Sequence, residues 1–292
     1  MYNIVLWGAG AVYNKHLNTL KLYEKVGELK VVGIIAKTLQ GVKKIDGYNV
    51  YPVEKLALPE YDYLMIMNER NFKEIMDEAI RAGVPKDKII SYRILELPNI
   101  DFENYFRLRS SRVTIISDNC WGGIVYKTLG LECISPFKNL FLKEEHYLKL
   151  LSDFQYYMEQ ELRFAYYCED EVKKVKYPVM CLGDVEIHFN HDVDGEAATQ
   201  KWERRKEKIN YDNLFVEMYT KDVEAARRFS QLDAYEKKLC FVNFETDIEC
   251  CMKLDSKEKE SEFWKTVNEN AGTGAIFNLV DLLNMKRKYR ME

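Results

Sequence analysis

The chain has 292 residues, which predicts about two domains at roughly 150 residues each. Hydrophobic residues make up 47% and charged residues 31% of the sequence, a composition typical of a globular protein with a substantial core. The net charge is −4, so the chain lacks the basic field that holds nucleic acid, and no nucleic-acid partner is expected.

The sequence also limits the expected compartment. No apolar run reaches the roughly 20 residues that span a bilayer, and the N-terminus leads directly into a strand, without the basic region of a signal peptide. The 7 cysteines are odd in number and form no CxxC pair, so neither a disulfide framework nor a zinc site is predicted. We therefore expect a cytoplasmic protein with reduced thiols; a homo-oligomer remains open.

The first half alternates strand-like and helix-like segments. Strands are predicted at 2–6, 30–36, 61–67 and 88–91, and helices at 12–26 and 72–82, with Gly83 as a C-cap. Such alternation predicts a parallel sheet with right-handed crossovers.

Gly8 and Gly10 follow the first of these strands, where a glycine turn allows a pyrophosphate to approach a helix N-terminus. Tyr13 occupies the position of the third glycine of that fingerprint. Lys37, rather than an acidic residue, follows the second strand. NAD(P) is therefore disfavoured. A nucleotide or nucleotide-sugar ligand at Gly8 and Gly10 and a purely structural turn both remain open.

The first half resembles the small Rossmann-like domains of bacterial sugar-modifying acetyltransferases and nucleotide-sugar dehydratases. The matching words are GAG at 8–10, DGYNVYP at 46–52 and YDY at 61–63, within residues 1–95. The resemblance implies that the glycine turn contacts a nucleotide-sugar.

A linker is predicted at 97–101 (LPNID), which divides the chain into domains 1–97 and 98–292. The second domain contains a predicted strand at 113–116, helices at 124–129, 144–161 and 196–209, a strand hairpin of 179–182 and 185–189, a β-α-β unit of 213–219, 221–232 and 238–242, and a terminal helix at 277–291. The predicted fold class is α/β, with two Rossmann-like or three-layer domains and mostly parallel sheets. We expect the functional cleft where the domains meet.

The segment 117–123 (SDNCWGG) is the clearest candidate site, because it places polar, thiol, aromatic and glycine residues at a strand-to-helix turn. A cysteine at a helix N-terminus has a lowered pKa and serves as a nucleophile, although Cys120 can also be read as a buried small hydrophobe. Asn119 and the N–H groups of Gly122 and Gly123 are candidate oxyanion donors. Trp121 and the two glycines are candidate substrate-binding residues.

A second cluster lies in 183–194 (GDVEIHFNHDVD). Period-two alternation puts Glu186 and His188 on one face of the strand, and we expect His188 to pack or to pair with a carboxylate. His191 lies just past the strand end, where histidine serves as an acid or base. Asp192 or Asp194 is the candidate orienter of His191.

A third cluster is the helical pair Arg204 and Arg205, which is either an anion-binding site or a solvated helix face. A metal site built from His188, His191 and Asp192 matches no strong zinc signature, so no metal is predicted.

The second half is similar to a bacterial domain-of-unknown-function family associated with exopolysaccharide biosynthesis loci. The matching words lie in one order within residues 112–245: SDNCWGG, SPFKNLF at 135–141, YP at 177–178, GD at 183–184, His191, KWERR at 201–205, IN at 209–210 and DN at 212–213. A related group has been proposed to be papain-like cysteine peptidases or acyltransferases, which implies a Cys120–His191 pair. The predicted parallel β-α-β unit speaks against a true papain fold.

Three functions follow. The leading hypothesis is an acyl- or glycosyl-group transferase or hydrolase of surface-polysaccharide assembly, with Cys120 as nucleophile, His191 as base and a small-molecule or saccharide substrate. The second is a non-catalytic nucleotide-sugar-binding or scaffold protein that needs the Gly8 turn but not the thiol. The third is a glycosyltransferase that uses Asp184 or Asp192 with a divalent metal.

Overall fold

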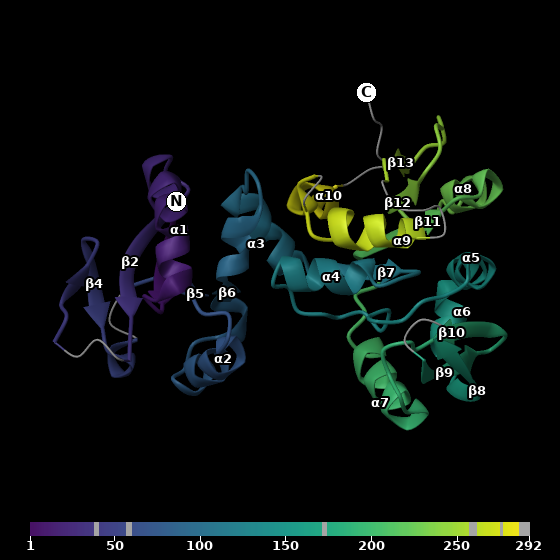
Figure 1. The fold of residues 1–292 in the computed structure, drawn as a ribbon, viewed down its shortest axis with the longest axis horizontal. Helices are drawn as coiled ribbons and strands as arrows, with labels where there is room; N and C mark the ends of the chain where they lie inside the picture. The colour runs from purple at the N-terminus through teal and green to yellow at the C-terminus, as the bar shows by residue number, and fades with distance from the viewer. Residues whose placement is uncertain (38–40, 57–59, 171–173, 257–261, 275–276, 286–292) are drawn as a thin grey trace. The chain divides into compact units, whose positions relative to one another are not determined.

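The computed structural model describes residues 1–37, 41–56, 60–170, 174–256, 262–274 and 277–285. The chain forms two compact units, Met1–Arg109 and Ser110–Glu292, with the boundary inside α3 (Phe102–Ser111). Both units are α/β, and parallel pairing predominates in the largest sheet of each (Figure 1). The predicted fold class is confirmed.

The first unit has a six-stranded sheet in the order β3-β4-β2-β1-β5-β6. Its strands are β1 (Tyr2–Trp7), β2 (Leu29–Ile35), β3 (Lys44–Ile45), β4 (Tyr48–Tyr51), β5 (Tyr63–Ile66) and β6 (Ile89–Ser91). The pair β3–β4 is antiparallel, and the other strand pairs are parallel. The chain builds outward from β1 first on one side and then on the other, so the strand order reverses between β1 and β5.

The helices of this unit agree with the predicted pattern. They are α1 (Ala11–Lys25), α2 (Phe72–Arg81) and α3, with single 3-10 turns η1 (Val53–Lys55), η2 (Lys86–Lys88) and η3 (Tyr92–Glu96). Gly83 follows α2 with φ +93°, which confirms the expected C-cap. The hairpin of β3 and β4 was missed, although Asp46-Gly47, both at positive φ, is a strong turn signal.

The second unit has a four-stranded parallel sheet in the order β13-β12-β11-β7. Its strands are β7 (Thr114–Ser117), β11 (Leu214–Thr220), β12 (Lys237–Val242) and β13 (Cys251–Lys253). Helix α8 (Val223–Ser230) connects β11 to β12, so the predicted β-α-β unit is confirmed. Helix α4 (Trp121–Thr128) packs on β7, and α8 packs on β11 and β12, so helices cover both faces of the sheet (Figure 1).

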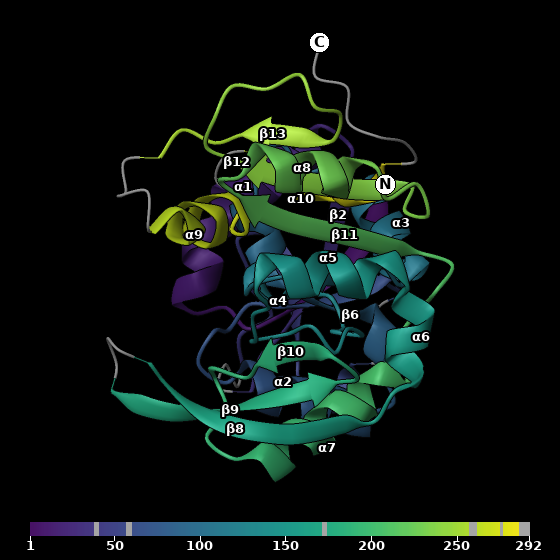
Figure 2. The same ribbon diagram turned by 90° about the vertical axis from the view of Figure 1, so that its right-hand side faces the viewer.

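A three-stranded antiparallel sheet, β10-β9-β8, forms a separate layer of the second unit (Figure 2). Its strands are β8 (Leu162–Asp170), β9 (Val175–Leu182) and β10 (Val185–His188). The predicted hairpin of β9 and β10 is confirmed, with Gly183 at φ +62° in its turn. Helix α5 (Glu144–Ser152) contacts β10, and α7 (Gly195–Lys206) contacts β8 and β9. Strand β8 was not predicted, because its LRFAYYCED sequence lacks a clean alternation.

Two predicted helices differ from the structure. The single helix expected at 144–161 is two, α5 and α6 (Phe154–Glu159), because Asp153 leaves helical geometry and its carboxylate accepts the Tyr156 N–H at 3.3 Å. The C-terminal helix is α10 (Leu279–Asn284), and residues 286–291 of the prediction lie outside the described residues. A short α9 (Phe263–Lys265) and a π-helical turn η5 (Thr266–Ala271) precede it.

The core of the second unit joins its two sheets. Buried side chains from α5, α6, β9, β10, β11 and α8 form one apolar cluster, so the antiparallel layer and the parallel sheet are packed together. Among the residues that the structure describes, no helix is both long and apolar enough to cross a membrane.

Candidate functional site

Cys120 lies at the carboxyl edge of the parallel sheet of the second unit. Strand β7 ends at Ser117, three residues turn the chain, and α4 begins at Trp121 with Cys120 as its N-cap residue. The prediction started the helix at Ile124, three residues too late, because Trp121-Gly122-Gly123 was read as loop. The thiol is half-buried.

His191 reaches this turn from the other sheet. It lies in an exposed turn directly after β10, and its Nε2 is 3.3 Å from Cys120 Sγ. The expected proximity of thiol and imidazole is confirmed. A thiol and an imidazole in hydrogen-bond contact can exchange a proton, which is the arrangement that activates a cysteine nucleophile.

Two consecutive residues connect the halves of this site. Phe141 exchanges backbone hydrogen bonds with His188, at 3.0 and 2.9 Å, which pins the end of β10. The next residue, Leu142, donates its N–H to the Asp118 carbonyl at 2.9 Å. The turn of Cys120 and the strand before His191 are thus joined through one short segment.

Two carboxyl groups are buried beneath the Cys120 turn. Asp118, in the turn itself, is 3% exposed, and Glu217, on β11, is 0% exposed. The Asn119 side-chain amide donates to Asp118 Oδ1 at 2.7 Å and lies 3.4 and 3.5 Å from the Glu217 oxygens, so one nitrogen separates the two groups. The Ser117 hydroxyl also donates to Glu217.

Burial makes both groups weak acids. Burial, joined by the negative charge of Glu217, raises the pKa of Asp118 well above its usual range. Burial likewise raises the pKa of Glu217 to about 8, against the hydrogen bonds from Ser117 and Asn119, which lower it. Neither role was predicted from the sequence; the signal for Glu217 is a lone glutamate inside the apolar strand LFVEMYT.

Asn119 faces this carboxyl pair. Its amide nitrogen is engaged by Asp118 and Glu217, and its Oδ1 accepts the Trp121 N–H at 2.6 Å. These contacts give Asn119 a structural role at the start of α4. Its role as an oxyanion donor stays a prediction.

The two orienter candidates have different partners. The Asp192 carboxylate forms an ion pair with Lys201 on α7. Asp194 is the N-cap of α7, and its carboxylate accepts the N–H groups of Glu196 and Ala197, both at 3.1 Å. The capping contacts account for Asp194, whereas Asp192 lies next to His191 and keeps its candidate role.

The three residues after Cys120 pack inside the unit. Trp121 is fully buried, with the rings of Phe215 and Phe241 each 5.9 Å away. A Cβ on Gly122 would meet Ile115 at 3.0 Å, and one on Gly123 would meet Asn139 at 3.1 Å. Close packing of α4 accounts for both glycines, and substrate contacts by these three residues stay predictions.

The remaining candidates have surroundings of their own. His188 is buried and stacks on Phe141 with 4.4 Å between ring centroids, and burial lowers its pKa to about 4, as expected for a packed histidine. On α7, Arg204 is exposed and Arg205 half-buried. Asp184 pairs with Lys149 and accepts the Tyr157 hydroxyl at 2.9 Å. Within the described ranges, no three His, Cys, Asp or Glu side chains gather as metal ligands.

The glycine turn of the first unit lies at the carboxyl edge of its own sheet. Gly8 has φ +111° and donates its N–H to the Ile35 carbonyl at 2.9 Å. Gly10 is the N-cap of α1, and a Cβ placed on it would meet no atom within 4 Å, so a side chain at this position has open space.

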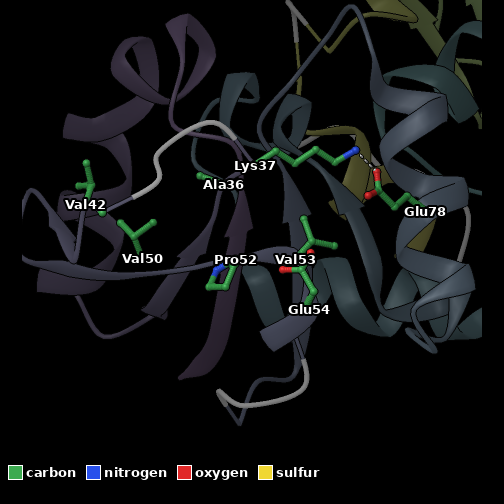
Figure 3. Close-up of a pocket in the computed structure, with 9 residues that line it drawn as sticks. Ala36, Lys37, Val42, Val50, Pro52, Val53, Glu54 and Glu78 are labelled. Atoms are coloured by element: carbon green, nitrogen blue, oxygen red, sulfur yellow. Dashed lines mark ion pairs between the residues drawn. The ribbon is translucent and has the colours of Figure 1, made fainter.

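A cavity of about 360 Å³ opens at the same edge, beyond the end of β2 (Figure 3). Its wall includes Val42, Val50, Val53 and the ion pair of Lys37 with Glu78, whose atoms are 2.5 Å apart. Ala36 also lines it and directly follows Ile35, the partner of Gly8. The cavity is therefore next to the glycine turn, because its lining residue Ala36 follows the residue that accepts the Gly8 N–H.

Residues 91–285 match the family described as a domain of unknown function, DUF1919. The chain belongs to the DUF1919 family. Residues 1–90 match a second family, described as C2185-like, N-terminal. The site residues of this DUF1919 chain, of which Ser117 is the first in the sequence and Glu217 the last, all fall within the first match.

An uncharacterized protein of Haemophilus influenzae is 35% identical to this DUF1919 chain over 116 residues. The match covers 40% of this chain and 53% of that protein, so the chain spans about half the length of this relative.

Proposed function

We propose that this DUF1919 protein is a cysteine-dependent acyl transferase or hydrolase. The observation that supports the proposal most directly is the 3.3 Å separation of Cys120 Sγ and His191 Nε2 at the carboxyl edge of a parallel sheet. That edge is where α/β proteins bind their ligands. The N-terminus of α4, on which Cys120 stands, favours negative charge on the sulfur.

The proposed reaction has two halves. His191 takes the thiol proton while Cys120 Sγ attacks the acyl carbonyl carbon, and the oxygen of the resulting tetrahedral intermediate carries the negative charge. The intermediate collapses to a thioester as its leaving group departs with the proton from His191. An acceptor hydroxyl or water then attacks the thioester, gives its proton to His191, and restores the thiol.

The side chains at the site favour acyl over glycosyl transfer. Glycoside hydrolysis uses two carboxyl groups that flank the scissile bond. Here the two nearby carboxyl groups, Asp118 and Glu217, are buried and bound by Ser117 and Asn119, whereas the thiol is half-buried and in contact with an exposed imidazole. We propose that the acceptor belongs to surface-polysaccharide assembly, on the basis of the family resemblance of the sequence words around the thiol.

Acylation of the thiol tests this proposal. Incubation with p-nitrophenyl acetate should add one acetyl group to the intact protein, visible by mass spectrometry and removed by hydroxylamine. Cys120→Ser should abolish that adduct, and Cys133→Ser should retain it, because Cys133 is also half-buried but bonds the Ser135 carbonyl. Acetylation that persists in Cys120→Ser, or fails in the wild type, would overturn the proposal.

A second function is favoured for the first unit, that of binding a nucleotide-sugar. The open space at Gly10, the positive φ of Gly8 and the cavity of about 360 Å³ occur at one sheet edge. The turn would hold the pyrophosphate at the N-terminus of α1, and the cavity is at the end of the neighbouring strand. This binding function does not require the thiol, so it also stands as the alternative if Cys120 is inert.

A further inference from the structure

We infer that the buried carboxyl groups of Asp118 and Glu217 act, through Asn119 and Ser117, as the positioning device of Cys120. The inference rests on the proposed function for the role of Cys120 itself. It assigns to the buried pair a task that the thiol–imidazole contact does not explain.

The first step is the route from the pair to the thiol. Asn119 holds both carboxyl groups with its amide nitrogen and accepts the Trp121 N–H with its Oδ1. Cys120 lies between these two residues, so its backbone is fixed from both sides. Removing either carboxyl group takes away one of the two contacts that hold the amide at the start of α4.

A second route runs from Glu217 to the same helix end. The Ser117 hydroxyl donates to Glu217 and accepts the Gly122 N–H at 3.4 Å. Glu217 thus reaches two consecutive N–H groups of the first turn of α4, each through one intervening side chain. On the other side, the Tyr147 hydroxyl donates to the Glu217 carbonyl at 2.8 Å and contacts the Ile116 carbonyl at 2.9 Å, which holds β11 and β7 in register.

The surroundings explain why the pair retains a proton. The titratable groups that interact with it electrostatically are Glu144 and Tyr147 on α5, Tyr219 on β11 and Cys240 on β12. Each of these is neutral or negative, so none compensates a second buried negative charge. Two carboxylates that share one amide donor away from water cannot both be ionised cheaply, so the pair keeps at least one proton near neutral pH.

The proton links the thiol to pH. When Glu217 loses its proton as pH rises, a new negative charge appears behind Asn119, and the turn and the thiol both respond. The raised pKa of Glu217, about 8, places this change near neutrality. We therefore expect the reactivity of Cys120 to show two inflections with pH, one from the thiol–imidazole pair and one from the carboxyl pair.

The experiment is the iodoacetamide alkylation rate of Cys120 in the full chain, followed by peptide mass spectrometry across about pH 5 to 9. Glu217→Gln keeps the shape, and its amide oxygen can still accept from Ser117 and Asn119, but it cannot titrate. It should therefore lose the second inflection and stay within about twofold of the wild-type rate at neutral pH. Glu217→Ala removes the support and should slow alkylation about tenfold. Rescue by glutamine distinguishes positioning from general destabilisation.

Glu144→Gln is the matched control, because Glu144 acts on the pair electrostatically but bonds Thr220 rather than Asn119. It should keep both inflections. A Glu217→Gln profile that retains the second inflection, or a folded Glu217→Ala protein that alkylates at the wild-type rate, overturns the inference. Alkylation requires no substrate, so a protein that cannot be acetylated but shows these profiles refutes the proposed function alone.

Discussion

Cys120 and His191 are in contact at 3.3 Å although 71 positions separate them in the sequence. Cys120 follows a strand of the parallel sheet, and His191 follows the last strand of the antiparallel sheet. The pair therefore exists only when both sheets are folded and packed together, and its reactivity reports on both.

Thiol labelling provides the first prediction. Iodoacetamide at neutral pH should modify Cys120 well before Cys240, which is fully buried and whose pKa is raised by that burial. His191→Ala should slow the labelling of Cys120 by roughly tenfold, because the imidazole no longer takes the proton. Peptide mass spectrometry gives both rates. Equal rates for Cys120 and Cys240 in the native protein would show that the Cys120 thiol is not activated and only fills space in the core.

Asp192 and Asp194 should respond differently to mutation. Asp194→Ala should lower the free energy of unfolding by about 1 kcal/mol through loss of the α7 cap, with no change in Cys120 labelling. Asp192→Asn should slow the labelling if its carboxylate helps to orient His191. Asp222→Ala is the control, because Asp222 caps α8 in the same way. If Asp194→Ala slows labelling and Asp192→Asn does not, the two roles are reversed.

The carboxyl pair predicts the pH dependence of stability. The pKa of Glu217 is raised to about 8 in the folded protein, so between its ordinary value and about 8 the folded state binds more protons than the unfolded state. The free energy of unfolding should therefore fall as pH rises across this window, with a slope of at most about 1.4 kcal/mol per pH unit for one proton. In urea titrations, the free energy of unfolding of Glu217→Gln should vary less with pH than that of the wild type. Glu145→Gln, at an exposed site, should show the wild-type pH dependence.

His188 should act in the opposite direction on the acid side. Burial lowers its pKa to about 4, so its contribution is fully present above about 6.5 and is lost as pH falls toward 4. His188→Phe keeps an aromatic ring against Phe141 and removes the titration, so it should flatten the acid limb. The same urea titrations measure this effect. An unchanged acid limb in His188→Phe would assign that limb to other groups.

The glycine turn of the first unit predicts ligand stabilisation. UDP-glucose and related nucleotide-sugars should raise the melting temperature of the wild type. Gly10→Val should fold normally, since a Cβ there meets no atom within 4 Å, but should fill the space above α1 and abolish the shift. Lys21→Ala, on the exposed side of α1, should retain it. The absence of a shift with a broad nucleotide panel would make the turn structural.

The periodic segments of the fold were predictable from the sequence. Buried parallel strands and their crossover helices, such as β11, α8 and β12, have apolar runs and caps that local reasoning reads correctly. Strand β8 was not, because the irregular pairing between Phe164 and Tyr166 breaks its alternation. The break at Asp153 was also missed, because a capping aspartate inside an apolar periodicity looks like one more polar position.

The site was predictable as two local clusters but not as a network. Cys120 and His191 are each marked by position at a strand end, and their pairing was expected. Glu217 stands out as a lone glutamate in an apolar strand, but its role could not be predicted, because its hydrogen-bond partner Ser117 is about 100 residues away in the sequence. The contacts of Asn119 with both carboxyl groups and with the Trp121 N–H were missed for the same reason, since hydrogen-bond partners are a property of the folded chain.

The segment Phe141–Leu142 imposes a constraint on chain length. Phe141 forms backbone hydrogen bonds with His188, and Leu142 forms one with Asp118. These two residues therefore set the distance between the two halves of the site. One residue inserted between Phe141 and Leu142 would move the Cys120 thiol away from the His191 imidazole, although Cys120 and His191 themselves would be unchanged. Insertions and deletions that separate members of the family should thus avoid this dipeptide.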